Sequence, residues 1–228
     1  MIHTDAPSFS AARDSDLGEN RMYRNDGTGS FADVTAGHLP ADALSTAALA
    51  LGDVDGDGDV VVGSSPCQRW VNDSAGAFAD ATATHLPATI GSTDDVALSD
   101  AGADGDPDLW VGIYGQQNQL LLNDGLGHYA DATAGHVPVD ADLTRVIEPL
   151  DVDADGDTDL IVGNRGQNRL YLNDAGGYFA EATLTHLPAV LDATNDLAAA
   201  DVDDGDLDYV SGNGEGYENS AEPEVVAT

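Results

Sequence analysis

A repeat of about fifty residues runs through most of this chain and carries two landmarks. One landmark ends in His-Leu-Pro or His-Val-Pro, and its histidines are spaced 47, 51 and 50 residues apart: His38, His85, His136 and His186. The other is an Asp-rich loop, with the same spacings between its first residues: Asp53, Asp100, Asp151 and Asp201. Two landmarks in one register indicate four copies of one unit, with a period in the range of propeller blades.

The third copy shows how a unit is built. Short apolar or alternating segments separated by Asp, Asn and Gly turns are typical of β-strands. Four such segments occur in order: 144–152, 159–164, 169–173 and 178–183. No stretch has a long apolar stripe at helical spacing, so we expect little helix. Four-stranded units repeated at this period favour an all-β fold, a β-propeller with four repeats.

The two ends of the repeat region carry complementary half-units. Residues 20–36 supply third and fourth strands, and residues 195–213 supply first and second strands. We therefore predict that both termini complete the last blade, because this hides edge strands. A fragment of a longer propeller, or pairing with a second copy, are the alternatives. The predicted division is a lead-in with an eroded strand (1–19), the propeller (20–213) and an acidic tail (214–228).

The Asp-rich loop of the third copy, DVDADGDTDL at 151–160, has the spacing of a calcium loop. Calcium takes six to eight oxygen ligands at about 2.3–2.6 Å, and alternate residues of a curled loop can supply them. Position 12 is Val162, and the flanks are strand-like, so the loop differs from an EF-hand. The predicted ligands are Asp151, Asp153, Asp155, Asp157 and Asp159.

The other three loops depart from this pattern, and we predict up to four calcium ions with 151–159 as the best site. The second loop has Gly102 at position 3 and keeps Asp100, Asp104, Asp106 and Asp108. The fourth is one residue short and offers Asp201, Asp203, Asp204, Asp206 and Asp208. The first offers Asp53, Asp55, Asp57 and Asp59. It lacks two residues, which we place after Asp59, so that its ninth-position ligand is lost. The expected order of occupancy is third, second, then fourth and first.

The pattern DxDxDGxxD, an apolar strand ending in Gly, and NRLYLNDxxGxF resembles the FG-GAP/VCBS repeat family, which includes the integrin α-chain propeller. The resemblance spans about residues 20–213. It implies a propeller with Ca²⁺ in the hairpin between first and second strands, an extracellular or cell-surface location, and adhesion or ligand binding on a loop face. Family propellers commonly have seven blades, whereas this chain has four repeats.

Composition narrows the partners. The chain has 42 Asp and Glu against 7 Arg and no Lys, a formal charge of −35. Binding to nucleic acid and attraction to anionic lipid both need clustered basic residues, so nucleic acids and anionic lipid surfaces are excluded as partners. The longest apolar runs are a few residues, which argues against membrane insertion. One cysteine, Cys67, rules out an intramolecular disulfide.

The remaining candidates are less specific. Arg145 and Glu148 break the repeat pattern in a first strand, so they are weak candidates for a ligand site on the propeller axis. The repeated histidines and asparagines are interpreted as turn residues, and Trp70 and Trp110 as core. We expect a non-enzymatic module that binds a glycan or an extracellular protein, as a monomer or by self-assembly. The alternatives are a polysaccharide hydrolase or lyase with an axial site, and a building block of an extracellular filament or other assembly.

Overall fold

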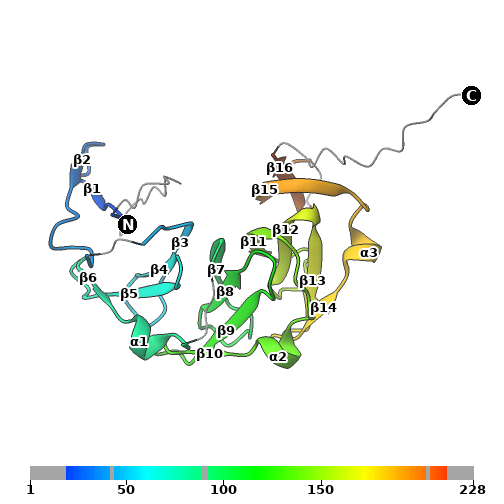
Figure 1. The fold of residues 1–228 in the computed structure, drawn as a ribbon, viewed down its shortest axis with the longest axis horizontal. Helices are drawn as coiled ribbons and strands as arrows, with labels where there is room; N and C mark the ends of the chain where they lie inside the picture. Colours follow the sequence, from blue (N-terminus) through cyan, green and yellow to red (C-terminus); the bar gives the residue numbers. More distant parts are fainter. Residues whose placement is uncertain (1–18, 42–43, 89–91, 204–205, 215–228) are drawn as a thin grey trace, which may run out of the picture.

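The computed structural model describes residues 19–41, 44–88, 92–203 and 206–214. The terminal segments 1–18 and 215–228, and with them most of the predicted lead-in and tail, lie outside the described residues, as does Asp204. The described chain is built from antiparallel sheets that follow one another along an arc (Figure 1).

Three complete units have the predicted four strands. The first is β3 (Ala48–Gly52), β4 (Asp59–Gly63), β5 (Gln68–Asn72) and β6 (Phe78–Asp80). The second is β7 (Asp95–Ser99), β8 (Asp108–Gly112), β9 (Gln119–Asn123) and β10 (Tyr129–Asp131). The third is β11 (Thr144–Leu150), β12 (Asp159–Gln167), β13 (Arg169–Asn173) and β14 (Phe179–Glu181). Consecutive strands pair antiparallel within each unit, so the strand assignment from the repeat is confirmed.

Among the described residues, helix is restricted to one short turn after each of the three complete units. These turns are α1 (Thr82–His85), α2 (Thr133–His136) and α3 (Thr183–His186), and each ends on a repeat histidine. The threonine that opens each turn also joins it to the sheet. Its hydroxyl oxygen accepts the backbone N–H of a third-strand residue: Thr82 accepts from Arg69, Thr133 from Leu120 and Thr183 from Leu170.

The first strands line the inside of the arc. β3 contacts β7, β7 contacts β11, and β11 contacts β15 (Figure 1). The second strands β4 and β8 are buried along their whole length. Gly163 ends the apolar run of β12, and a Cβ there would lie 2.8 Å from the Thr194 methyl group. Neighbouring inner strands thus approach too closely for a side chain at this position.

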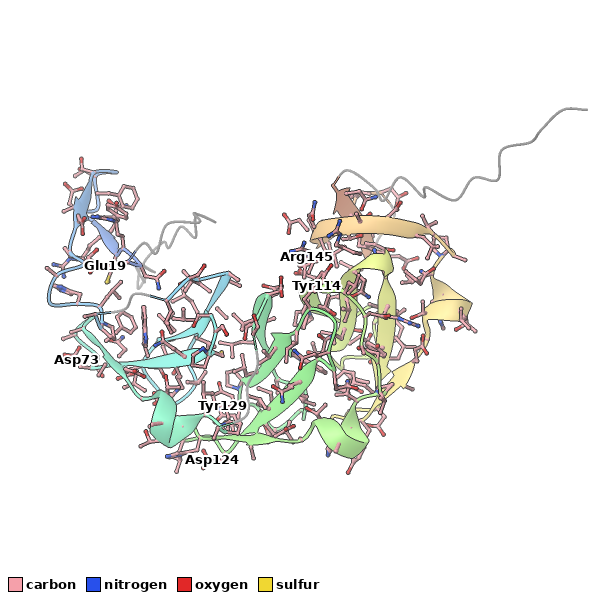
Figure 2. The ribbon with its side chains drawn as sticks, in the orientation of Figure 1. Glu19, Asp73, Tyr114, Asp124, Tyr129 and Arg145 are labelled. Carbon is pink, nitrogen blue, oxygen red and sulfur yellow. The ribbon has the colours of Figure 1, made fainter. Side chains whose placement is uncertain are left out.

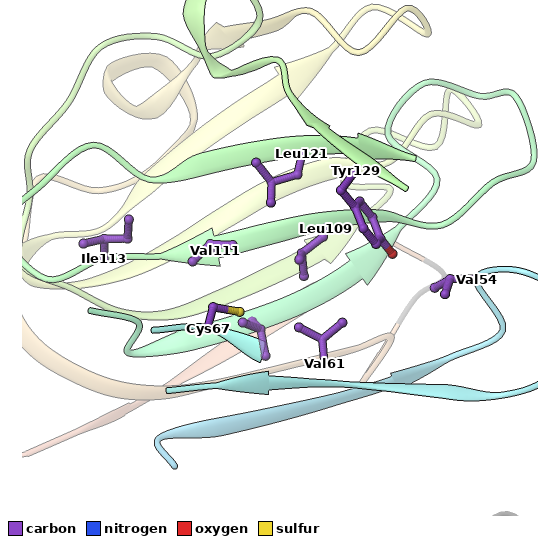
Figure 3. Packing of buried hydrophobic residues seen from close by; sticks show 9 residues of the cluster. Val54, Val61, Cys67, Leu109, Val111, Ile113, Leu121 and Tyr129 are labelled. Carbon is purple, nitrogen blue, oxygen red and sulfur yellow. The ribbon is translucent and has the colours of Figure 1, made fainter. Parts of the chain in front are cut away.

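The core lies between units. In the cluster of Figure 3, Val54, Val61 and Cys67 of the first unit pack against Leu109, Leu121 and Tyr129 of the second. Trp70 and Trp110 are fully buried, as expected for core residues, and the Trp110 ring packs edge-on against Phe179, with 4.9 Å between ring centroids. Third- and fourth-strand residues of one unit therefore cover the face of the preceding unit.

The two half-units are present, but the predicted pairing between them is not made. The N-terminal pair is β1 (Tyr23–Asn25) with β2 (Phe31–Asp33), and the C-terminal pair is β15 (Leu191–Ala200) with β16 (Asp208–Asn213). Among the described strands, β1 pairs only with β2, and β16 pairs only with β15. The long strand β12 pairs through Arg165–Gln167 with the start of β15, which ties the C-terminal pair to the third unit. The two pairs stand at opposite ends of the arc (Figure 1).

Candidate metal loops

Each Asp-rich loop connects the first and second strands of its sheet, as the sequence predicted. In the third loop, carboxylate oxygens of Asp151, Asp153 and Asp159 lie within 4.8 Å of one another. Three carboxylates this close repel one another unless a cation lies between them. Burial raises the pKa of Asp159, and the charges of Asp153 and Asp155 raise it further. The donor set is all oxygen and strongly anionic, which fits a hard divalent cation.

Backbone hydrogen bonds shape this loop. Asp151 Oδ2 accepts the N–H of Gly156 at 3.1 Å, and Asp155 Oδ1 accepts that of Asp157 at 3.0 Å. Two residues adopt left-handed φ: Ala154 at 60° and Gly156 at 98°. The chain thereby curls back on itself, which brings position 1 toward the residues that follow.

The ninth-position aspartate closes the loop and begins the second strand. Asp159 Oδ1 accepts the N–H of Asn173 at 2.8 Å, and its Oδ2 accepts that of Val152 at 2.9 Å. In the second loop, Asp108 accepts the N–H groups of Asn123 and Ala101 in the same way. In the fourth, Asp208 Oδ2 accepts the N–H of Val202 at 3.2 Å. This residue joins the loop to the sheet in addition to any role as a ligand.

The other loops differ in how many carboxylates they gather. Asp201, Asp203 and Asp208 of the fourth loop come within 4.8 Å, as do Asp55, Asp57 and Asp59 of the first. Within the described residues, the second loop forms no such triad. Its third position is Gly102, whose N–H instead donates to Asp108 Oδ2 at 3.2 Å. The ligand that the sequence lacks there is thus missing from the folded loop as well.

The first loop corrects the sequence interpretation. Asp59 begins β4, and its Oδ1 accepts the N–H of Asn72 at 2.7 Å, as Asp108 and Asp159 do in their units. Asp59 is therefore the ninth-position residue, and the prediction that this ligand had been lost is wrong. The Gly56 N–H bonds to Asp53, as the glycines of the other loops bond to Asp100 and Asp151. The two missing residues consequently lie inside the loop, before Gly56.

The closing oxygen of the first loop has a different partner. Asp59 Oδ2 accepts from Arg69 Nη2 at 2.6 Å, and Asp55 Oδ2 accepts from the same nitrogen at 3.0 Å. The Arg69 side chain is 0% exposed and Asp59 1%. Burial raises the pKa of Asp59 to about 6, while the N–H of Asn72 and the guanidinium lower it. Repeat counting missed this ion pair because Arg69 stands in a strand, outside the loop motif.

A second contact also escaped the sequence interpretation. The asparagines that end the third strands accept turn N–H groups, as predicted: Gly127 bonds to Asn123 and Gly177 to Asn173. Their amide groups, in addition, reach the loop of the preceding unit. Asn123 Nδ2 donates to the Val54 carbonyl at 3.1 Å, and Asn173 Nδ2 to the Ala101 carbonyl at 2.9 Å. Each Asp-rich loop between complete units is thereby fixed to the next unit.

The axial candidates lie on the inner strand β11. Arg145 forms an ion pair with Asp94 at 3.4 Å, and its guanidinium lies 5.0 Å from the ring centroid of Tyr114 (Figure 2). Burial, and the nearby Asp196 charge, raise the pKa of Glu148. Burial raises the pKa of Asp95 to about 6, with Glu148 and Asp196 adding to the rise. The inner strands therefore carry two half-buried carboxylates, Asp95 and Glu148, close to that of Asp196, together with a separate Arg145–Asp94 ion pair.

Two of the repeat histidines stack on rings of the next unit, and the cysteine is buried. His85 stacks on His128 with ring centroids 4.5 Å apart, and His136 stacks on Tyr178 at 4.2 Å. Each stack joins the helical turn of one unit to a hairpin of the next. Cys67 is buried, and burial raises the pKa of its thiol to about 12, as expected for an inert core residue.

These observations define a class: an all-β protein of repeated four-stranded units, with an Asp-rich loop in the first hairpin of each complete unit. The family model for FG-GAP-like repeats matches residues 9–62 and 151–211, half of the chain. The protein therefore belongs to the FG-GAP-like repeat family. Within the described residues, no helix is long and apolar enough to cross a membrane. No curated protein matches the chain.

Several solved structures are similar to it. A lectin of Agrocybe aegerita, specific for non-reducing terminal N-acetylglucosamine, is 17% identical with a TM-score of 0.47, over 74% of this chain and 47% of the lectin. The V. cholerae biofilm matrix protein Bap1 is 18% identical with a TM-score of 0.46, over 90% of this chain and 30% of Bap1. YCF48, solved with a D1 peptide, is 13% identical with a TM-score of 0.46, over 80% of this chain and 52% of YCF48. The chain thus spans about half or less of each.

Proposed function

We propose that this protein is a calcium-stabilised β-propeller module that acts outside the cell by binding or by assembly, without catalysis of its own. The observation that carries the proposal is the third loop, where Asp151, Asp153 and Asp159 converge. Asp155 and Asp157 of the same loop complete the proposed ligand set. Calcium would supply the positive charge that lets these carboxylates share one turn.

An extracellular setting agrees with this chemistry. Calcium sites of extracellular modules typically have Kd values of about 10⁻⁴–10⁻³ M, and such sites are filled where calcium is abundant. The loop joins β11 to β12, so a bound ion would hold the hairpin at the centre of the third unit. The proposed role of the metal is therefore structural: it stabilises a scaffold whose surfaces do the binding.

The proposed ligand is a glycan or an extracellular protein, contacted at the axial end of β11. Arg145 and Glu148 remain the candidate contacts, since the Arg145–Tyr114 pair offers a cation beside an aromatic face. The test is an array of glycans and matrix proteins probed with calcium and with EDTA. Wild-type binding that Arg145→Ala removes, and that Arg24→Ala on β1 does not, is expected. Binding that survives Arg145→Ala would place the ligand elsewhere.

Self-assembly is a second candidate function, favoured by the two half-units. Tyr171 and Phe179 of the third unit are 2% and 7% exposed because they pack on the second unit. Their equivalents in the N-terminal pair, Tyr23 and Phe31, are 38% and 56% exposed. In the part of the chain that the structure describes, no preceding unit covers them.

The other end of the arc carries the matching surface. Tyr171 and Phe179 share a cluster with four residues of the second unit: Ala101, Trp110, Leu120 and Val137. The same four repeat positions of the third unit line an apolar pocket beside β16: Val152, Ile161, Leu170 and Leu187. We propose that the N-terminal pair of a second copy occupies this pocket, with Tyr23 and Phe31 taking the places of Tyr171 and Phe179.

Light scattering over a range of protein concentrations tests the assembly. A mass that rises above 23.4 kDa with concentration, and that Tyr23→Ser with Phe31→Ser returns to 23.4 kDa, is expected. The matched control is Leu126→Ser, an exposed hairpin residue of the second unit at 66% exposure. A wild type of 23.4 kDa at every concentration would contradict assembly between copies.

A further inference from the structure

We infer that the guanidinium of Arg69 is the resident cation of the first loop, so that this loop takes no calcium although its carboxylates cluster as in the third. The inference deepens the proposed calcium binding and rests on it for the contrast between loops. The first and third loops share the Asp-rich motif, and the residue that distinguishes them, Arg69, lies outside that motif.

Every carboxylate of the first-loop triad already has a partner. Arg69 Nη2 lies between Asp55 and Asp59, at 3.0 and 2.6 Å from their oxygens. The hydroxyl of Ser74 donates to Asp57 Oδ2 at 2.6 Å. In the third loop the corresponding donors are neutral N–H groups, and within the described chain no arginine forms an ion pair there. The two triads are thus alike in spacing and different in charge balance.

Arg69 stands at a repeat position that is occupied by leucine in the other two complete units. It is the second residue of β5, and the equivalent residues of β9 and β13 are Leu120 and Leu170, both buried. A buried arginine without a carboxylate partner is strongly unfavourable, whereas one bonded to carboxylates can be retained. Arg69 Nε and Nη1 find no partner within the described residues, so the two carboxylates are its whole compensation.

The neighbouring unit makes room for the guanidinium. A Cβ on Gly127 of the second unit would lie 2.8 Å from Arg69 Cζ. Gly177 is the equivalent glycine of the third unit, where it packs against the second unit. The atom nearest to a Cβ on Gly177 would be the Ala101 carbonyl oxygen at 3.4 Å, an ordinary contact. Arg69 therefore occupies the boundary between the first and second units as well as the loop.

The shortened loop fits the same assignment. The two missing residues fall before Gly56, which leaves the loop with four aspartates where the third has five. A loop that has lost a ligand position binds calcium more weakly. A cation supplied by the protein itself balances the carboxylate charge without calcium. A fixed arginine charge holds the hairpin whether or not calcium is present.

Calcium titration of the full chain, with the bound ions counted by equilibrium dialysis, tests the assignment. Asp159→Asn is expected to bind one ion fewer than the wild type, and Asp59→Asn the same number as the wild type. Asp57→Asn serves as a second first-loop variant if Asp59→Asn does not fold. Loss of one ion in a first-loop variant would overturn the inference. A wild type that binds no ion, or an unchanged count in Asp159→Asn, would instead refute the third-loop proposal.

A measurement in EDTA tests the arginine without reference to calcium. Arg69→Met, Asp59→Asn and the double variant are compared by melting temperature. Because each single change leaves a buried partner uncompensated, the double variant is expected to lose less than the sum of the two single losses. Additive losses would show that Arg69 and Asp59 do not depend on each other, and would overturn the inference whatever the calcium count.

Discussion

The side-chain amide of Asn173 donates to the carbonyl of Ala101, 72 residues earlier in the chain, at 2.9 Å. Asn123 makes the same bond to Val54 across 69 residues, at 3.1 Å. Each bond joins a hairpin turn of one unit to the Asp-rich loop of the unit before it. The first and second loops are therefore held at both ends by their own sheet and on one side by the next unit.

Asn173→Ala is expected to lower the free energy of unfolding by about 1–3 kcal/mol, because it leaves the buried Ala101 carbonyl and the turn N–H groups without this partner. Asn25→Ala is the matched control. Asn25 accepts the same kind of turn hydrogen bond from Gly29, but no bond from its side-chain amide to another unit is made within the described residues. Urea unfolding in saturating calcium measures both. Equal losses in the two variants would mean that the bond between units contributes nothing.

The boundary between the first two units gives a second prediction. Gly127 and Gly177 have nearly the same left-handed φ, 76° and 74°, so alanine strains both backbones by about 1–2 kcal/mol. Gly127→Ala is expected to cost more than Gly177→Ala, since its Cβ also meets the Arg69 guanidinium. Chemical denaturation measures the two losses. Adding Arg69→Leu to each glycine variant should reduce the extra cost at Gly127 only, and an equal cost at both glycines would contradict the packing.

Asp95 predicts how stability depends on pH. Burial raises its pKa from 3.8 to about 6 in the folded protein, so the folded state binds this proton more tightly than the unfolded state does. The free energy of unfolding therefore falls as pH rises from about 4 to about 6, and the loss persists at neutral pH. Asp95→Asn should raise stability at pH 7 by on the order of 1–3 kcal/mol, with little effect below pH 4. A benefit that does not change with pH would show that Asp95 titrates normally.

Much of the fold followed from the sequence, because a repeat reports each element several times. The strands of the three complete units, the position of the Asp-rich loops and the core roles of Trp70 and Trp110 were all predictable. Each depends on local pattern: β-branched runs, Asn-Asp-Gly turns and alternation. The pairing of residues 20–36 with 195–213 is not found in the described chain: β12 extends beyond Gly163 and pairs with the start of β15, while β16 pairs with β15 alone. Local pattern predicts the strands of the two half-units but not which sheet each half-unit joins.

The candidate site was less predictable. Counting positions from Asp53 onward led to the wrong place for the missing residues, whereas counting backward from the strand DVVVG would have assigned Asp59 correctly. The strand is the better reference because the closing aspartate bonds to the third strand, which fixes its position. Arg69 could have been noticed as the one charged residue where the sister strands have leucine. The carboxylates that Arg69 contacts could not be predicted from the sequence, since these contacts depend on how the shortened loop folds.

If calcium in the third loop stabilises this scaffold, the melting temperature at low ionic strength must depend on whether calcium or EDTA is present. A ligand present at a hundred times its Kd adds about 2.7 kcal/mol to the stability of the state that binds it. The wild type is expected to melt at a clearly lower temperature in EDTA than in calcium. Asp159→Asn is expected to lose most of that difference. A wild-type melting temperature that EDTA leaves unchanged would contradict the account.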